Sequence, residues 1–306
     1  MPRQDVEFKT QDHVTLRGWL YTPSTAGEAL KKLPCLVMSH GWTALKEMAL
    51  DEFAEAFTSK LPIACLVFDN RGFGASDTAL NQPRFEIIPS LQTSDISDAI
   101  TYAQSREEID ASKIGIWGSS YSGGHSLYVA GCDKRVKACI SQVPLVNGWE
   151  NFHRLIRADI VLGLNAMFEG DRLARAAGKA PAMIPVVSNE PLTPSSLPSA
   201  DSYEFFIPWE AKGVWKNEVT VRSIELFRAY DPSCHITHVA PTPLLMCVAE
   251  NDGVTPTDLA LRAYAQALEP KQLVMLPGGH FDAYSGTTFT YNVGKQVEFL
   301  QRTLCR

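Results

Sequence analysis

Short apolar runs alternate along this chain with longer stretches in which apolar residues recur at helical spacing. LPCLVMSHG at 33–41 reads as a buried strand that ends in a glycine turn, and LKEMALDEFAEAFTSK at 45–60 has the helical pattern. Residues 5–9 and 14–21 alternate like an antiparallel hairpin; further strands are expected at 63–72, 113–118, 136–144, 243–252 and 272–279, and further helices at 91–105, 257–268 and 289–304. Strands that alternate with helices predict an α/β fold with a mostly parallel, doubly wound sheet.

The alternation is interrupted between about 147 and 232. The interruption begins with a helical stretch (149–177), continues through a loop rich in Pro and Ser, and ends in a second helical stretch. We therefore expect a core formed by 1–146 and 233–306, and a mainly helical lid at 147–232. The aromatic side chains of the lid are expected either to line a substrate pocket or to pack within the lid, and the candidates for the pocket are Phe152, Phe168, Trp209 and Trp215.

Composition excludes several classes of function. The 306 residues carry a net charge of −6, and no run of Lys or Arg indicates a nucleic-acid or membrane surface. No apolar run reaches the ~18 residues of a membrane span, and the N-terminus lacks the apolar region of a signal peptide. The seven cysteines form no C-x-x-C pair, and His235-x-x-His238 lacks a third ligand, so no metal is expected. A reducing, cytoplasmic location is expected.

The stretch GIWGSSYSGG at 115–124 places three serines at the end of a predicted strand. A serine becomes a useful nucleophile when a sharp strand-to-helix turn exposes it, and such a turn requires small residues two places before and after it. Ser119 has Trp117 two places before it, which excludes it. Ser120 and Ser122 both satisfy the size rule, but Ser122 should already lie in the helix. We therefore expect Ser120 to be the nucleophile; a turn without chemistry is the alternative.

Candidate partners for Ser120 follow in the order Ser, acid, His. Asp252 comes at the end of the strand PLLMCVAE, and His280 comes just past the next strand. We expect His280 to accept the Ser120 proton, and Asp252 to fix the histidine tautomer and stabilise the imidazolium. Asp282, Glu250 and Asp258 are the alternatives for the acid.

Two backbone N–H groups are needed to stabilise the oxyanion of an acyl-transfer reaction. One is expected from Tyr121, the residue after the nucleophile, and the other from Trp42 in the His40-Gly41-Trp42 turn. His40 is expected to shape that turn through hydrogen bonds. The glycine-rich loop DNRGFGASD at 69–77 is expected to be structural, because it lacks the G-x-G-x-x-G pattern of a dinucleotide site.

Together, the serine turn, the H-G-W turn, the D-x-R-G-x-G-x-S-D loop and the late Asp and His resemble the α/β-hydrolase superfamily over nearly the whole chain. Gly118-x-Ser120-Tyr121-x-Gly123-Gly124 is similar to the G-x-S-Y-x-G elbow of X-Pro dipeptidyl-peptidase, cocaine-esterase-like and dienelactone-hydrolase-like proteins. The run PTPLLMCVAENDGVTPTDLALRAYAQALEPKQLVMLPGGHFDAY resembles fungal polyketide transferases and hydrolases of secondary-metabolite clusters. This resemblance implies an α/β-hydrolase fold and ester or thioester substrates, either small or bound to a carrier, with no cofactor.

The leading hypothesis is a serine hydrolase that cleaves an ester or thioester, such as a polyketide acyl group, through an acyl-enzyme. An acyltransferase that passes the acyl group to an alcohol is the first alternative. A cyclase or isomerase that uses His280 as a base and a non-catalytic binding protein are the others. The aromatic lid favours a bulky or long apolar acyl chain, and a homodimer stays open.

Overall fold

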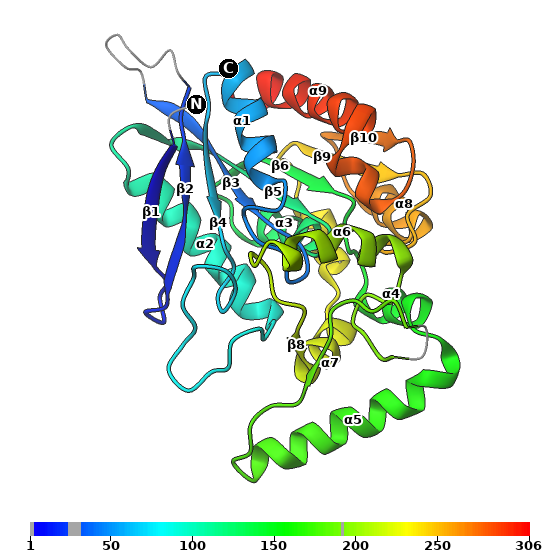
Figure 1. The fold of residues 1–306 in the computed structure, drawn as a ribbon. Coiled ribbons are helices and arrows are strands. Elements are labelled where there is room, and N and C mark those ends of the chain that lie inside the picture. Colours follow the sequence, from blue (N-terminus) through cyan, green and yellow to red (C-terminus); the bar gives the residue numbers. More distant parts are fainter. Residues whose placement is uncertain (1–2, 24–31, 191–192) are drawn as a thin grey trace.

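A central sheet organises the molecule in the computed structural model, which describes residues 3–23, 32–190 and 193–306 (Figure 1). Within these residues the strand order of the larger sheet is β1-β2-β4-β3-β5-β6-β9-β10. The strands are β1 (Arg3–Lys9), β2 (Thr15–Tyr21), β3 (Leu33–Ser39), β4 (Ala64–Phe68), β5 (Ile109–Ser119), β6 (Val136–Gln142), β9 (Leu244–Ala249) and β10 (Lys271–Leu276). The β1–β2 and β2–β4 pairs are antiparallel and all other pairs in this sheet are parallel. The mostly parallel α/β sheet predicted from the sequence is confirmed.

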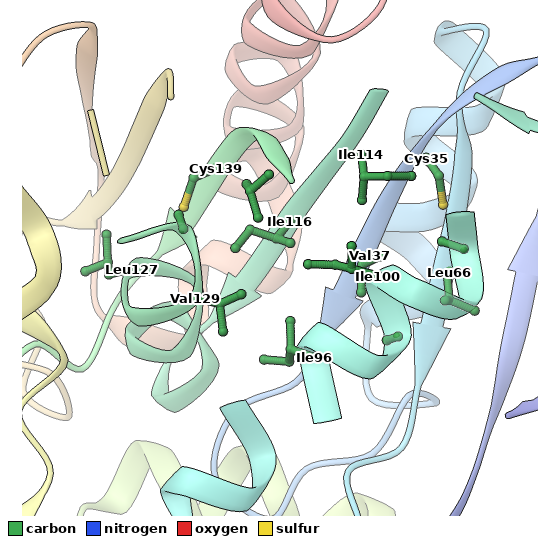
Figure 2. Packing of buried hydrophobic residues seen from close by; sticks show 14 of the residues in the cluster. Cys35, Val37, Leu66, Ile96, Ile100, Ile114, Ile116, Leu127, Val129 and Cys139 are labelled. Atoms are coloured by element: carbon green, nitrogen blue, oxygen red, sulfur yellow. The ribbon is translucent and has the colours of Figure 1, made fainter. Parts of the chain in front are cut away.

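Helices cover both faces of the sheet, so most strands are buried on two sides. One face is covered by α2 (Pro89–Ser105), α3 (Tyr121–Cys132) and α8 (Thr257–Gln266), and the other by α1 (Leu50–Lys60) and α9 (Gly286–Thr303). Figure 2 shows the first of these cores, where side chains of α2 and α3 meet those of β3 and β5. The free thiols Cys35 and Cys139 pack there as small apolar groups.

Strands β4, β9 and β10 end three or four residues before the expected ends at 72, 252 and 279, and two elements begin four or more residues away from the expected start. Helix α1 begins at Leu50 and not at 45, because Ala49 has φ 73°, a left-handed conformation that cannot continue a right-handed helix. Residues 40–49 instead form turns in which the carbonyl oxygen of Met48 contacts Nε2 of His40 at 2.5 Å. Strand β5 begins at Ile109, four residues before the expected start: Ile109 already pairs with Leu33 of β3, and the small or polar residues 110–113 that follow are only partly buried or exposed.

The segment between β6 and β9 is mainly helical. Its helices are α4 (Gly148–Leu155), α5 (Ala158–Ala176), α6 (Ala200–Ala211) and α7 (Val221–Ala229). It also contains the short antiparallel pair β7 (Met183–Ile184) and β8 (Val219–Thr220) and, after the last helix, the 3-10 turn η1 (Pro232–His238). The single helical stretch expected at 149–177 is two helices. Figure 1 shows α5 farthest from the sheet. None of the helices in the described residues is long and apolar enough to cross a membrane.

The two ends of the helical part of this segment, residues 147–148 and 230–231, lie side by side. The N–H of Gly148 donates to the carbonyl of Tyr230 at 2.7 Å, and Nδ2 of Asn147 donates to Oδ2 of Asp231 at 2.9 Å. Its buried apolar residues form a third cluster, which includes Trp42 and Tyr121 of the core. The segment therefore packs directly on the turns that follow β3 and β5. Its interpretation as a lid with the boundaries 147 and 232 stays a prediction.

Candidate active site

Ser120 occupies the turn between β5 and α3. Its backbone has φ 57° and ψ −120°, a conformation that costs an L-residue about 1–3 kcal/mol and that persists only where neighbours enforce it. The N–H of Ser120 donates to the carbonyl of Gln142 at 2.8 Å, and its carbonyl accepts from Gly123 and Leu145, both at 2.9 Å. A Cβ at Gly118 would lie 1.8 Å from the Ser122 carbonyl oxygen, which is the physical cause of the size rule two places before the serine.

The structure brings Ser120, His280 and Asp252 into one line of contacts. Oγ of Ser120 lies 3.0 Å from Nε2 of His280, and Nδ1 of His280 lies 2.8 Å from Oδ2 of Asp252. The other oxygen of Asp252 accepts the backbone N–H groups of Val254 at 2.9 Å and Thr255 at 2.7 Å. Because a carboxylate can only accept, Nδ1 of His280 carries the proton of this pair and Nε2 faces the serine as an acceptor.

The three alternative acids lie elsewhere. Asp282 accepts the N–H of Gly279 at 2.7 Å, and Asp258 pairs on the surface with Arg154 at 2.7 Å. Glu250 is exposed. Among the candidates, only Asp252 contacts the buried His280 ring in the described residues.

The His40-Gly41-Trp42 turn lies directly against Ser120. A Cβ on Gly41 would meet Cβ of Ser120 at 2.7 Å. Tyr121 is the first residue of α3, so its N–H has no acceptor in the helix. Within residues 3–23, 32–190 and 193–306 the N–H of Trp42 has no hydrogen-bond acceptor either. The two N–H groups predicted for the oxyanion thus both stand beside Ser120 without acceptors.

His40 holds this turn in shape. Its Nδ1 accepts the N–H of Gly41 at 2.7 Å, and its Nε2 faces the carbonyl of Met48. Burial lowers the pKa of His40 to about 4, so the ring is neutral at pH 7. The hydroxyl of Ser122 donates to the His40 carbonyl. The serine that departs from the G-x-S-x-G pattern therefore joins the elbow to the turn.

Ser119 belongs to a buried polar network beneath the elbow. Its Oγ lies 2.5 Å from the Tyr284 hydroxyl and accepts from Nε2 of Gln142 at 2.9 Å. The network continues from Gln142 to Asn292 at 2.6 Å and Gln296 at 2.8 Å, both on α9. Tyr284 ends the 3-10 turn η2 (His280–Tyr284), so the network ties the segment that carries His280 to the sheet.

The family described as alpha/beta hydrolase fold matches residues 34–287. The chain is an α/β hydrolase. It is 32% identical over 304 residues to the polyketide transferase grgF of Penicillium sp., covering 99% of this chain and 97% of that one. It is 30% identical over 306 residues to a thiohydrolase of Eupenicillium brefeldianum, covering 98% and 94%. The crystal structure of the α/β hydrolase GrgF from Penicillium sp. sh18 superposes with a TM-score of 0.85 at 30% identity, covering 100% of both chains. The resemblance to fungal polyketide transferases and hydrolases is confirmed.

Two pockets of this α/β hydrolase meet at Ser120. The first, the Phe152 chamber, contains about 460 Å³ of empty space, part of it open to solvent, and its own lining includes Tyr121, Leu145, Phe152, Leu155, Ile224 and Phe227. The second, the Phe281 chamber, contains about 280 Å³ of empty space, part of it open to solvent, and its own lining includes Ala44, Phe205, Phe206, His280, Phe281 and Tyr284. Trp42, Ser120, Leu197 and Val254 line both chambers.

Of the four aromatic residues expected in the substrate pocket, the structure places Phe152 in the chamber that carries its name. The other three pack elsewhere. Phe168 is buried beneath the guanidinium of Arg228, and Trp209 stands beside the ammonium of Lys212. Trp215 is buried with its ring against Phe206. Sequence reasoning instead missed Leu145, Leu155, Ile224 and Phe227, which carry no signal beyond ordinary apolar spacing.

Thr255 was also not predicted from the sequence. Its hydroxyl lies 3.0 Å from Oδ2 of Asp252, 3.2 Å from Nδ1 of His280 and 2.9 Å from the carbonyl of Val143. Its position three residues after the acid, in a turn that wraps the carboxylate, is the signal that could have found it.

Two indole groups join the turn after β3 to the segment between β6 and β9. Nε1 of Trp42 donates to the hydroxyl of Ser196 at 2.9 Å. Nε1 of Trp215 donates in the opposite direction, to the carbonyl of Thr43 at 3.0 Å. The position of the Trp42 backbone is thus coupled to the packing of this segment.

Proposed function

We propose that this α/β hydrolase cleaves an ester or thioester through an acyl-enzyme on Ser120. The observation that carries the proposal is the 3.0 Å contact between Ser120 Oγ and His280 Nε2, with His280 oriented by Asp252. In this arrangement the serine proton passes to Nε2 as Oγ bonds to the acyl carbon. The N–H groups of Trp42 and Tyr121 would stabilise the resulting oxyanion, and removal of one such donor costs about 3–4 kcal/mol of transition-state stabilisation in related chemistry.

The acyl group is proposed to be apolar and of polyketide type. The relatives named polyketide transferase and thiohydrolase support this class of substrate. The apolar linings of both chambers support it independently. Activity against matched small-molecule and carrier-bound thioesters tests whether the physiological substrate is a small molecule or a carrier-bound acyl group.

Hydrolysis and acyl transfer differ only in the acceptor of the second step. We propose hydrolysis as the basal reaction, because water needs no dedicated site. Transfer to an alcohol is the second candidate, and the apolar side chains of Trp42, Leu197 and Val254 around the half-buried Ser120 favour it, since partial exclusion of water lets an alcohol compete. Product analysis with and without an added alcohol distinguishes the two reactions.

The decisive experiment is covalent trapping. A fluorophosphonate probe should add to the wild-type chain and to Ser122→Ala, but not to Ser120→Ala, as read by intact mass. Ser120→Ala should also lose turnover of an activated ester, whereas Ser122→Ala should keep it. Full turnover by Ser120→Ala would refute the proposal and favour a cyclase or isomerase that uses His280 as a base.

A cytoplasmic location and a homodimer, both considered from the sequence, stay predictions. Fractionation of the native host and the mass of the purified chain by light scattering test them.

A further inference from the structure

The two chambers at Ser120 differ in one respect that matters for chemistry: only one of them contains His280. The Phe281 chamber is lined by His280 and by the adjacent Phe281, whose ring lies 4.9 Å from the imidazole between centroids. The Phe152 chamber contains Ser120 and Tyr121 but not His280. The position of the histidine therefore gives the chambers different places in the reaction.

In the first half-reaction Ser120 Oγ bonds to the acyl carbon, and its proton moves to His280 Nε2. The bond from the acyl carbon to the leaving oxygen or sulfur then breaks, and the proton on Nε2 moves to that atom. In the second half-reaction an acceptor hydroxyl gives its proton to Nε2 and bonds to the acyl carbon; the bond to Ser120 Oγ then breaks and the proton on Nε2 returns to that oxygen. The leaving and accepting atoms must therefore lie on the His280 side, and the acyl chain on the other side.

On this basis we propose that the Phe281 chamber binds the alcohol or thiol part of the substrate and the acceptor, and that the Phe152 chamber binds the acyl chain. The assignment rests on the proposed function of Ser120. It names a site for a second, organic reactant in addition to the acyl site.

The linings specify the chemistry of both reactants. Among the described residues, neither chamber is lined by an Asp, Glu, Lys or Arg side chain. The Phe281 chamber has an aromatic wall in which the rings of Phe205 and Phe281 are stacked with centroids 4.5 Å apart. Its occupant is a neutral alcohol or thiol with an apolar or aromatic body next to the reacting atom, because such surroundings offer dispersion contacts and no partner for a charge.

Two polar side chains of the Phe152 chamber, Asn151 and Ser196, have protein partners, whereas the buried hydroxyl of Tyr121 has none among the described residues. Nδ2 of Asn151 donates to the carbonyl of Val254 at 3.0 Å, and the hydroxyl of Ser196 accepts from Trp42. The chamber is therefore suited to a neutral, largely apolar acyl chain, and it holds more empty space than the Phe281 chamber.

The test varies the two parts of the substrate independently. Acetyl, hexanoyl and decanoyl esters of ethanol, benzyl alcohol and 2-phenylethanol are compared by kcat/KM, because these alcohols have similar acidity. Wild type should prefer decanoyl over acetyl and benzyl over ethyl. Leu155→Trp, which fills the Phe152 chamber, should reduce the decanoyl preference by about tenfold and leave the benzyl preference unchanged. Ala44→Leu, which fills the Phe281 chamber, should reduce the benzyl preference and leave the decanoyl preference unchanged. It should also slow the formation of benzyl esters from added benzyl alcohol.

Phe205→Ala provides a second variant of the Phe281 chamber, in case Ala44→Leu does not fold. It should raise activity toward the 2-phenylethyl esters relative to the ethyl esters. The assignment is overturned if Leu155→Trp changes the benzyl preference, or if the variants of the Phe281 chamber change the decanoyl preference. It is also overturned if wild type does not distinguish benzyl from ethyl esters. Activity that survives in Ser120→Ala would instead show that the proposed function itself has failed.

Discussion

Replacement of Asp252 by Asn is predicted to leave His280 in the wrong tautomer. The asparagine can place its carbonyl oxygen at only one of the two carboxylate positions. At Oδ1 the oxygen keeps the N–H groups of Val254 and Thr255, and the NH₂ group then faces Nδ1 of His280. The opposite orientation would leave those two buried donors without acceptors, at about 1–3 kcal/mol each. The first orientation is therefore favoured by roughly 2–6 kcal/mol, and it forces Nδ1 to accept.

With Nδ1 as an acceptor, the proton moves to Nε2, which can no longer accept from Ser120. The expected loss is about 10⁴-fold in kcat/KM for an activated ester, with folding intact. The assay is steady-state hydrolysis together with the rate of fluorophosphonate labelling. Asp258→Asn is the matched control, since that carboxylate pairs with Arg154 at the surface and should leave both rates unchanged. Retention of more than about a tenth of wild-type activity by Asp252→Asn would refute this reasoning.

Three further predictions concern the structure around the site. Trp215→Phe keeps an aromatic ring but removes the indole N–H that donates to the Thr43 carbonyl. The free energy of unfolding in urea should therefore fall by about 1 kcal/mol and Ser120 should be labelled more slowly; unchanged labelling would mean that this hydrogen bond does not position the turn. Arg71→Gln leaves the buried Asp95 carboxylate without its guanidinium, so the free energy of unfolding should fall by about 3–5 kcal/mol, and a loss below about 1 kcal/mol would contradict this. Burial lowers the pKa of His125 from 6.5 to about 3, so between these values the unfolded chain binds more protons there and stability falls as the pH falls, by at most about 1.4 kcal/mol per pH unit. His125→Asn should flatten this part of the stability profile measured by denaturation, and an unchanged slope would assign it to other groups.

The sheet and the contact among Ser120, His280 and Asp252 could be predicted from the sequence for one reason. Parallel strands bring their carboxyl ends to the same edge, so residues that directly follow β5, β9 and β10 converge whatever their separation in the chain. The strand pattern predicts those ends to within three residues. The contact is thus a property of topology, although the catalytic roles await the experiments above.

The chambers could not be predicted in this way. Phe168 and Trp215 looked as suitable as Phe152 because the sequence around a buried aromatic residue does not show which neighbours its ring will contact. Which side chains line a pocket depends on the crossing of α4 and α7 over the elbow, and that crossing is set by tertiary packing. The prediction of the start of α1 was wrong for a similar reason, because contacts with His40 stabilise the turn that replaces the expected first residues.

The meeting of residues 147–148 with 230–231 has a consequence for how such enzymes diversify. Because the ends of the segment lie within hydrogen-bond distance, the sheet experiences it as a closed loop, and the entropy of closing a loop grows only slowly with its length. We therefore expect that residues 149–229 can be exchanged as a cassette with little disturbance to the strands that precede Ser120, Asp252 and His280, provided that the hydrogen bonds of Trp42 to Ser196 and of Trp215 to Thr43 are kept. Most of the side chains that distinguish the Phe152 chamber come from this cassette, so one chemistry can be redirected to new acyl groups by changing a single contiguous stretch of the gene.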